Sequence, residues 1–339
     1  MPRRGLRLQS IMNHNTLINE DDLMTKIIFL GTPEFSATVL RGLLKEGYDV
    51  IAAVTQPDKP VGRKQKLQKS PVKLVAESEN IKLYQPAKLP KSPEVEELKA
   101  LHADLIITAA YGQFLPTSFL ESAKVAAINV HGSLLPKYRG GAPIQWSLLN
   151  GDKETGITIM YMVKGMDAGD IISQEKLPIE KDDDNGSLFE KMAIVGRELL
   201  LDTIPKILSG DISPIKQDPD KVVFSPNISK EQEHIDFTQP AETVFNQIRA
   251  LSPDPGAWTM LDGQRTKLYK TEVVELNSHQ AIGTVADLGK KRLVIVAGDG
   301  QGVSIKKIQP AGKKVMDIAN YMNGLGKNLE KGQQVIDEK

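Results

Sequence analysis

The sequence predicts an α/β chain in which a Rossmann-like, doubly wound, mostly parallel sheet is followed by a small C-terminal β-barrel domain of the OB-like kind. Two observations support this prediction. Before residue 210, short apolar strands alternate with amphipathic helices, which is typical of a parallel sheet covered on both faces. Beyond residue 230, several short β-type segments follow one another with turns between them, which is typical of a small barrel.

The first unit is expected to begin with an apolar strand at residues 26–30. Behind this strand, Gly31-Thr32-Pro33 predicts a helix start, with Thr32 as the N-cap and Pro33 as the first helical residue. A dinucleotide-binding fold would carry Gly-x-Gly-x-x-Gly here, and only Gly31 is present, which argues against a nicotinamide enzyme. Later strands are expected at residues 48–55, 81–84, 104–110, 125–130, 156–163 and 171–177, and later helices from Val72 and at residues 94–101, 143–149 and 187–208.

A change in composition separates the two units. Residues 210–229 contain prolines, mixed charge and little periodicity, so they are expected to form a linker between a first domain at 24–209 and a second at 230–332. The second domain is expected to hold a helix at residues 241–251 and strands at residues 257–261, 267–276, 283–287, 292–297 and 302–309.

Residues 1–23 differ from the rest of the chain. Arg3, Arg4 and Arg7 are followed by polar and acidic residues without an apolar core, which is not the pattern of a signal peptide. We expect this segment to be a disordered N-terminal extension and the folded chain to start at Met24. The absence of an export signal favours a cytoplasmic location.

Composition limits the kinds of site. Cysteine is absent, which excludes disulfides and cysteine-based metal sites, and the five histidines are scattered without ligand spacing, so no metal is expected. No apolar run approaches the ~20 residues that a membrane span needs. Lys plus Arg and Asp plus Glu number 43 each, so a nucleic-acid partner would have to be held by local basic patches.

A polar pair stands at the end of the strand at residues 125–130. Asn129 and His131 lie two residues apart, so both side chains leave the same face of an extended chain. Ligands bind at the carboxyl ends of strands in open α/β sheets, and an amide beside an imidazole there can donate hydrogen bonds to an oxyanion. The alternative interpretation is that these two residues only cap backbone groups.

An acidic turn, Gly165-Met166-Asp167-Ala168-Gly169-Asp170, lies between two later strands. A carboxylate from this turn could orient and charge the His131 imidazole. We therefore expect Asn129, His131 and Asp167 to form one catalytic centre.

A long basic connection follows the second strand, at residues 56–69. Connections of this kind usually have only about 2–6 residues, and this one carries several cations and no acid after Asp58. It is either a solvated surface loop or an arm that binds phosphates. The cations are Lys59, Arg63, Lys64, Lys66 and Lys69.

The segments INVHGSLLPKYRGGAP and TGITIMYMVKGMDAGDII resemble the 10-formyltetrahydrofolate-dependent formyltransferases, in particular the methionyl-tRNA formyltransferases. The run from Ile228 to Trp258 is similar to the start of their C-terminal β-barrel domain. Phe237 replaces a frequent Trp, and Lys137-Tyr138 replaces a frequent Arg-Trp. The resemblance extends from Met24 to about Gly332.

The resemblance implies a cosubstrate, partners and further site residues. It implies 10-formyltetrahydrofolate as cosubstrate and initiator methionyl-tRNA as acceptor, with Arg63 and the neighbouring lysines reaching the tRNA. A monomer is our default expectation. The residues that would bind the folate are Tyr111, Gly112, Gly132, Ser133, Leu134, Leu135 and Pro136.

The predicted reaction is transfer of the formyl group to the α-amine of the charged initiator tRNA, by direct attack through a tetrahedral oxyanion. Asn129 and protonated His131 would bind that oxygen, and Asp167 would shuttle the proton of the amine. Two alternatives remain open at this stage. The first is a sibling formyltransferase acting on a small amine, or a formyl-folate hydrolase. The second is a non-catalytic RNA-binding protein.

Overall fold

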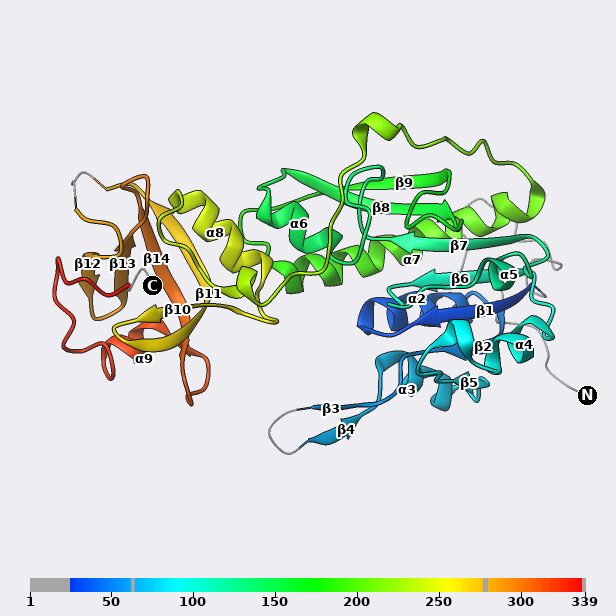
Figure 1. Cartoon of the computed structure of the whole chain (residues 1–339), viewed down its shortest axis with the longest axis horizontal. Coiled ribbons are helices and arrows are strands. Elements are labelled where there is room, and N and C mark those ends of the chain that lie inside the picture. Colours follow the sequence, from blue (N-terminus) through cyan, green and yellow to red (C-terminus); the bar gives the residue numbers. More distant parts are fainter. Residues whose placement is uncertain (1–24, 62–64, 277–279, 337–339) are drawn as a thin grey trace, which may run out of the picture.

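The first unit is built around a seven-stranded sheet in the order β5-β2-β1-β6-β7-β8-β9 (Figure 1). The computed structural model describes residues 25–61, 65–276 and 280–336, so the expected extension at 1–23 lies outside the described residues. The five strands from β5 to β7 are parallel, and β8 and β9 continue the sheet antiparallel, which confirms a mostly parallel sheet. The strands are β1 (Lys26–Gly31), β2 (Asp49–Val54), β5 (Leu83–Tyr84), β6 (Leu105–Ala109), β7 (Ala126–His131), β8 (Glu154–Tyr161) and β9 (Ile171–Pro178).

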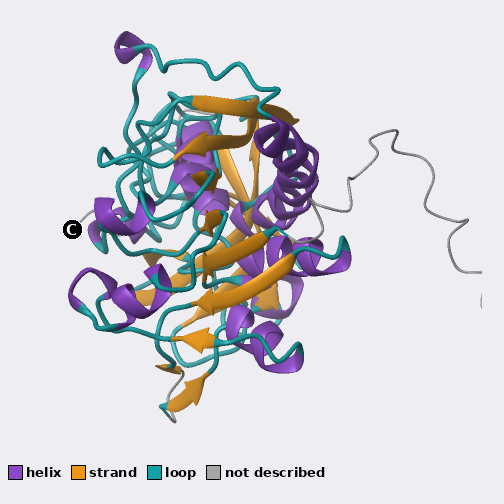
Figure 2. Cartoon of the chain, turned by 90° about the vertical axis from the view of Figure 1, so that its right-hand side faces the viewer, coloured by secondary structure: helices purple, strands orange, loops and turns teal. Residues whose placement is uncertain are grey.

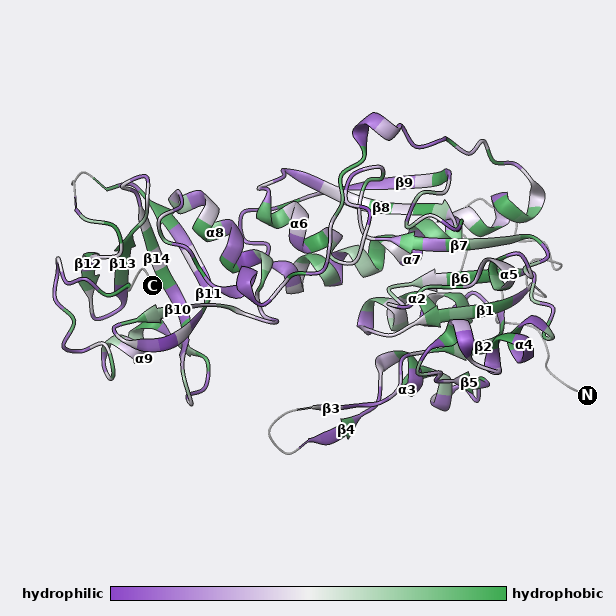
Figure 3. Ribbon diagram, viewed as in Figure 1, coloured by the Kyte–Doolittle hydropathy of each residue, from purple (hydrophilic) through white to green (hydrophobic). Residues whose placement is uncertain are grey.

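Helices cover both faces of this sheet (Figure 2). In β1, Ile27 and Phe29 point into one hydrophobic core and Ile28 and Leu30 into another, so the strand is apolar on both sides. Figure 3 shows this sheet interior as predominantly hydrophobic. The helices of this unit are α2 (Glu34–Lys45), α3 (Pro71–Ser78), α4 (Glu94–Lys99), α5 (Thr117–Leu120), α6 (Pro143–Leu149) and α7 (Asn185–Ser209).

The first helix starts one residue later than predicted. Its N-cap is Pro33, which is extended with ψ −178°, so the assignment of Thr32 as N-cap was wrong. The Thr32 hydroxyl instead donates to the carbonyl of Tyr111 and accepts the N–H of Gln56, both at 3.3 Å. These bonds tie together the segments that leave β1, β2 and β6 at their carboxyl ends.

The long basic connection is not a plain loop. It contains a two-stranded antiparallel hairpin of β3 (Lys59–Val61) and β4 (Lys66–Gln68). The hairpin extends away from the sheet on the side of the molecule that faces the C-terminal unit (Figure 1). Ser70 then caps α3 by accepting the N–H of Lys73 at 3.1 Å.

The second unit is an antiparallel β domain, with strands in the order β10-β11-β14-β13-β12 and β15 paired to β14. The C-terminal segment joins the two edges, since Ile336 bridges Leu261 in β10 and Gln334 bridges Thr284 beside β12. Val335 and Ile336 are buried in its core, which therefore extends beyond Gly332. The elements are α8 (Ala241–Ala250), β10 (Ala257–Leu261), β11 (Gln264–Val274), β12 (Val285–Gly289), β13 (Arg292–Val296), β14 (Gly302–Pro310), β15 (Met316–Asp317) and α9 (Ile318–Met322).

Helix α8 joins the two units. Ile248 packs in the core of the β domain, whereas Ala250 packs in the core of the first unit. Two hydrogen bonds cross the boundary beside this helix, from the N–H of Gly186 to the carbonyl of Ser252 at 3.1 Å and from Arg249 Nη1 to the carbonyl of Glu180 at 3.3 Å. The domain boundary is therefore packed rather than open.

A buried carboxylate next to α7 gives a testable stability effect. Burial raises the pKa of Asp183, but hydrogen bonds from Lys191, Ser187 and the N–H of Glu180 outweigh burial and hold that pKa below its ordinary 3.8. A lowered pKa in the folded state stabilises the protein above the unfolded pKa, and this contribution is lost as pH falls below about 4. Asp183→Asn is expected to reduce the free energy of unfolding at neutral pH by about 1–3 kcal/mol.

Urea unfolding of Asp183→Asn and wild type between pH 7 and pH 3 measures this effect. The two curves should converge toward acid. Asp182→Asn is the matched control, because the Asp182 side chain is 91% exposed. A constant difference between wild type and Asp183→Asn at every pH would contradict the assignment.

Candidate active site

Two of the predicted catalytic residues lie at the carboxyl end of strand β7. Asn129 is half-buried and His131 is buried, and the register pairs Asn129 with Thr108 of the neighbouring β6. The Thr108 hydroxyl donates to Asn129 Oδ1 at 2.7 Å. Because the carbonyl end of the amide is held in this way, the Nδ2 group remains to donate outward.

The imidazole of His131 lies between two oxygen atoms. Its Nε2 is 2.9 Å from the carbonyl oxygen of Tyr138, and its Nδ1 is 3.7 Å from Asp167 Oδ2. A carbonyl only accepts, so Nε2 carries a proton. The Nδ1 atom faces the carboxylate of Asp167. At 3.7 Å the Nδ1 to Asp167 contact is too long to be a hydrogen bond, so Nδ1 is not tied to this carboxylate.

The carbonyl that holds His131 belongs to an anchored residue. The Tyr138 ring is buried, and its hydroxyl donates to Asp152 Oδ2 at 2.6 Å and accepts from Asn150 Nδ2 at 3.0 Å. Burial, together with the bond to Asp152, raises the pKa of Tyr138 to about 12, so the phenol stays protonated. The same Tyr138 carbonyl also accepts the Ser225 hydroxyl at 3.0 Å.

The turn that contributes Asp167 is held in a constrained conformation. Asp167 has φ +47°, in the left-handed region, and its Oδ2 accepts the N–H of Gly140 at 2.8 Å. A Cβ atom at Gly169 would lie 1.8 Å from the Tyr161 carbonyl, so only glycine allows the return of this turn to the sheet. The structure therefore brings Asp167 to His131, as the sequence predicted.

The turn after His131 presents mainly backbone, because its side chains are engaged within the domain. Ser133 is fully buried and its hydroxyl donates to the carbonyl of Lys137 at 2.6 Å. Leu135 is buried against Met160 and Ile171. Leu134 covers Gly156 of β8, and Pro136 and Gly132 are half-buried.

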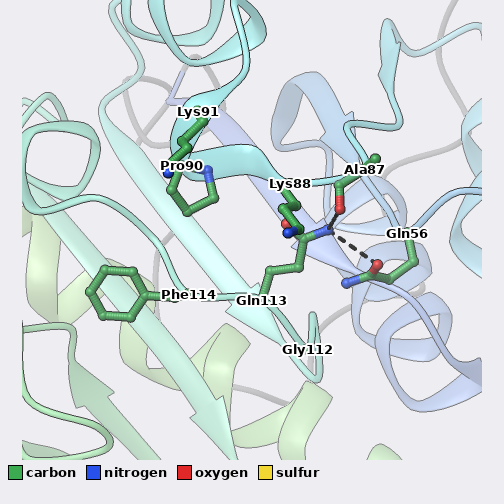
Figure 4. Close-up of a pocket in the computed structure, with 8 residues that line it drawn as sticks. All are labelled: Gln56, Ala87, Lys88, Pro90, Lys91, Gly112, Gln113 and Phe114. Atoms are coloured by element: carbon green, nitrogen blue, oxygen red, sulfur yellow. Dashed lines mark hydrogen bonds between the residues drawn. The ribbon is translucent and has the colours of Figure 1, made fainter.

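Tyr111 and Gly112 lie beside a separate feature. The Tyr111 ring is buried in the core, and no partner for its hydroxyl is found in the described residues. Gly112, with φ +83°, lines a cavity of about 400 Å³ (Figure 4). Of the predicted folate residues Gly112 alone lines this cavity; the other lining residues are Gln56, Ala87, Lys88, Pro90, Lys91, Gln113 and Phe114.

The predicted tRNA residues lie on the β3–β4 hairpin or beside it. Lys59 and Lys66 are exposed, whereas Lys69 is paired with Glu77 at 2.7 Å. Arg63 and Lys64 lie outside the described residues.

Four residues around the catalytic centre were not found from the sequence. Thr108 holds Asn129, Tyr138 and Ser225 hold His131 through one carbonyl, and Gln217 contacts the Asp167 turn. Thr108, Ser225 and Gln217 act through contacts with segments distant in sequence, whereas Tyr138 lies seven residues after His131 and acts through its backbone carbonyl, which no side-chain pattern marks. The only available signal was Thr108 on a buried strand beside the Asn129 strand.

The chain matches two family models. Residues 25–204 match the formyl transferase family and residues 227–326 match the formyl transferase C-terminal domain. A methionyl-tRNA formyltransferase of Lactobacillus gasseri is 57% identical over 315 residues, which are 93% of this chain and all of that relative. The chain belongs to the methionyl-tRNA formyltransferases. The family member of Lactobacillus acidophilus is 56% identical over the same share of the chain.

Solved structures with less sequence similarity share the fold of this family member. The N-formyltransferase of Helicobacter canadensis, in complex with folinic acid and dTDP-3-aminofucose, has a TM-score of 0.64 at 22% identity, covering 85% of this chain and 100% of that one. HypX of Aquifex aeolicus, in complex with tetrahydrofolic acid, has a TM-score of 0.63 at 17% identity. That match covers 92% of this chain, which spans about half the length of HypX. Among the helices of the described residues, none has the length and apolar character needed to cross a membrane.

Proposed function

We propose that this chain transfers the formyl group of 10-formyltetrahydrofolate to the α-amine of initiator methionyl-tRNA, by direct attack at a centre formed by Asn129, His131 and Asp167. The observation that carries the proposal is the placement of the His131 ring between the Tyr138 carbonyl and the Asp167 carboxylate. This placement leaves one N–H of the imidazolium for an oxygen that develops negative charge.

The reaction would proceed in two stages. The amine nitrogen attacks the formyl carbon, and the carbonyl oxygen becomes an oxyanion bound by Asn129 Nδ2 and His131 Nδ1–H. Asp167 Oδ2 accepts the N–H of Gly140. No partner of Oδ1 is found among the described residues. Oδ1 can therefore accept the proton of the attacking amine, directly or through water. The oxyanion then reforms the carbonyl as the bond from the formyl carbon to N10 breaks, and the proton held by Asp167 passes to N10 as the folate leaves.

Family membership supports the substrate assignment. Relatives named methionyl-tRNA formyltransferase align with nearly the whole chain, including the C-terminal β domain. A hydrolase or an enzyme for a small amine does not need a basic hairpin to bind its substrate. A non-catalytic RNA-binding protein does not need an oriented Asn129 amide. We further infer that the enzyme is a cytoplasmic monomer and that the C-terminal domain and the hairpin bind the tRNA.

The test is an acceptor comparison. Labelled 10-formyltetrahydrofolate is incubated with the protein and either charged initiator methionyl-tRNA, uncharged tRNA, free methionine or buffer alone. We expect label only on the charged tRNA. Release of formate without labelled tRNA would establish the hydrolase alternative, and absence of any folate turnover would favour the non-catalytic one.

Charge removal on the hairpin is expected to weaken tRNA use without changing the chemistry. The double variant Lys59→Gln/Lys66→Gln should raise KM for methionyl-tRNA while kcat is retained, because both exposed side chains would contact phosphates. The slope of log KM against log salt should fall by about 1 for each lost contact.

Lys45→Gln is the matched control for these variants. Lys45 is exposed at the end of α2, at the opposite edge of the sheet from the carboxyl ends of the strands. An unchanged salt slope in the hairpin variant would remove the hairpin from the proposed tRNA surface.

A further inference from the structure

The segment between the two domains is attached to the catalytic unit along its length. After α7 it returns over the sheet beside β9 before it reaches α8 (Figure 1). Ile215 forms a two-way backbone bridge with Ile171 at the start of β9, with both bonds at 2.8 Å. Further along, Arg139 donates its N–H to Val223 at 2.9 Å and accepts the N–H of Ser225 at 2.7 Å.

Close approach of backbones at the second attachment excludes larger side chains there. Gly140 has φ +132°, and a Cβ atom on it would lie 2.6 Å from the Ser225 carbonyl. At Gly141 the neighbouring atom is a side-chain one, since a Cβ atom there would lie 2.1 Å from Asn227 Oδ1 and that side chain would have to move. The segment is therefore seated against the loop that provides the acceptor for His131 and the N–H for Asp167.

Gln217 lies between the two attachments and contacts the catalytic turn directly. Its Nε2 donates to the carbonyls of Asp167 at 2.8 Å and Gly169 at 2.7 Å, and its Oε1 accepts from Arg139 Nε at 2.9 Å. Carbonyls only accept and a guanidinium only donates, so the orientation of this amide is fixed. One side chain thus joins the turn that carries Asp167 to the loop that faces it.

We infer that Gln217 is a positioning residue for the formyl transfer, acting through Asp167, and that the inter-domain segment is a structural part of the catalytic centre. The inference rests on the proposed role of Asp167. A left-handed residue such as Asp167 is maintained only where its surroundings hold it, and here two of the three turn residues at 167–169 are fixed through their carbonyls by Gln217. Without these bonds the turn is free to move its carboxylate away from the reacting amine.

Two replacements test whether the two hydrogen bonds donated by Gln217 matter, as distinct from the size of its side chain and the bond that its Oε1 accepts. Gln217→Met keeps the length of the side chain and removes all three bonds. Gln217→Glu keeps the acceptor for Arg139, but places a carboxylate oxygen against two carbonyls. Both variants are expected to lower kcat about 10- to 100-fold, as a displacement of the order of 1 Å in a catalytic group can do, with Gln217→Glu at least as impaired and with KM for both substrates within about twofold of wild type.

The experiment compares these variants with Ser213→Ala, an exposed control in the same segment, and with Asp167→Asn alone and combined with Gln217→Met. If Gln217 acts through Asp167, Gln217→Met costs less than about twofold further in the Asp167→Asn background. Kinetics are measured well below the Tm of every variant, so that unfolded protein cannot account for a loss of kcat.

The role of Gln217 and the role of Asp167 are overturned by different kinetic results. A wild-type kcat in Gln217→Met, or an equal loss with and without Asp167, overturns the role of Gln217. An unimpaired Asp167→Asn enzyme instead overturns the proposed role of Asp167, whatever the Gln217 variants do.

Discussion

Replacing Asn129 with Ala is expected to lower kcat for formyl transfer about 10²–10³-fold, because it removes one of the two proposed hydrogen-bond donors to the oxyanion. The loss should appear in kcat rather than in KM, since the bond to the oxygen strengthens only as negative charge develops. Steady-state kinetics with saturating 10-formyltetrahydrofolate and varied methionyl-tRNA measure this effect.

A control variant shows whether the loss of kcat comes from the Asn129 amide itself or from any Asn→Ala replacement. Asn320→Ala removes an exposed amide on α9 and should leave kcat unchanged. If Asn129→Ala raised KM for the folate and kept kcat, Asn129 would be a binding residue and the oxyanion would need another donor.

Asp167→Asn is expected to lower kcat by about 10²–10⁴-fold, the usual range for a lost general acid or base. The amide is nearly the same size as the carboxylate and still accepts the N–H of Gly140, so the turn is preserved. What is lost is the negative charge beside His131 Nδ1 and the acceptor for the proton of the amine. The dependence of kcat on pH should therefore differ between the variant and wild type.

A pH–rate series on Asp167→Asn and wild type tests this assignment. Asp182→Asn, at a highly exposed position in the same domain, serves as the control for removing one carboxylate. An Asp167→Asn enzyme that kept the wild-type turnover and pH profile would assign the proton transfer to another group.

The sheet was predictable because its signal is local. Strands such as β1 and β6 are continuous apolar runs that are buried on both faces, and the amphipathic pattern of α7 extends over its whole length. The β3–β4 hairpin could not be predicted in the same way. Its described side chains are exposed whatever their polarity, Leu67 included, so no alternation marks a buried face.

The arrangement of the proposed catalytic centre was predictable where the residues carry a local pattern. Asn129 and His131 share a strand face by spacing alone, and the glycines around Asp167 mark a tight turn. The side chains of Ser133 and Leu135 could not be placed from the motif, and the structure shows them engaged inside the domain. Gln217 gave no signal, because a single glutamine in a segment without periodicity acquires its role only when that segment meets the Asp167 turn.

The most direct test of the central claim is a single-turnover experiment on the double variant Asn129→Ala/Asp167→Asn. Enzyme in excess over charged initiator methionyl-tRNA is mixed with labelled 10-formyltetrahydrofolate, and tRNA affinity is measured on the same samples. We predict unchanged tRNA affinity and a transfer rate reduced by at least about 10³-fold, since both the oxyanion donor and the proton acceptor are gone. Transfer at the wild-type rate by a folded double variant would show that the formyl group is transferred at another site.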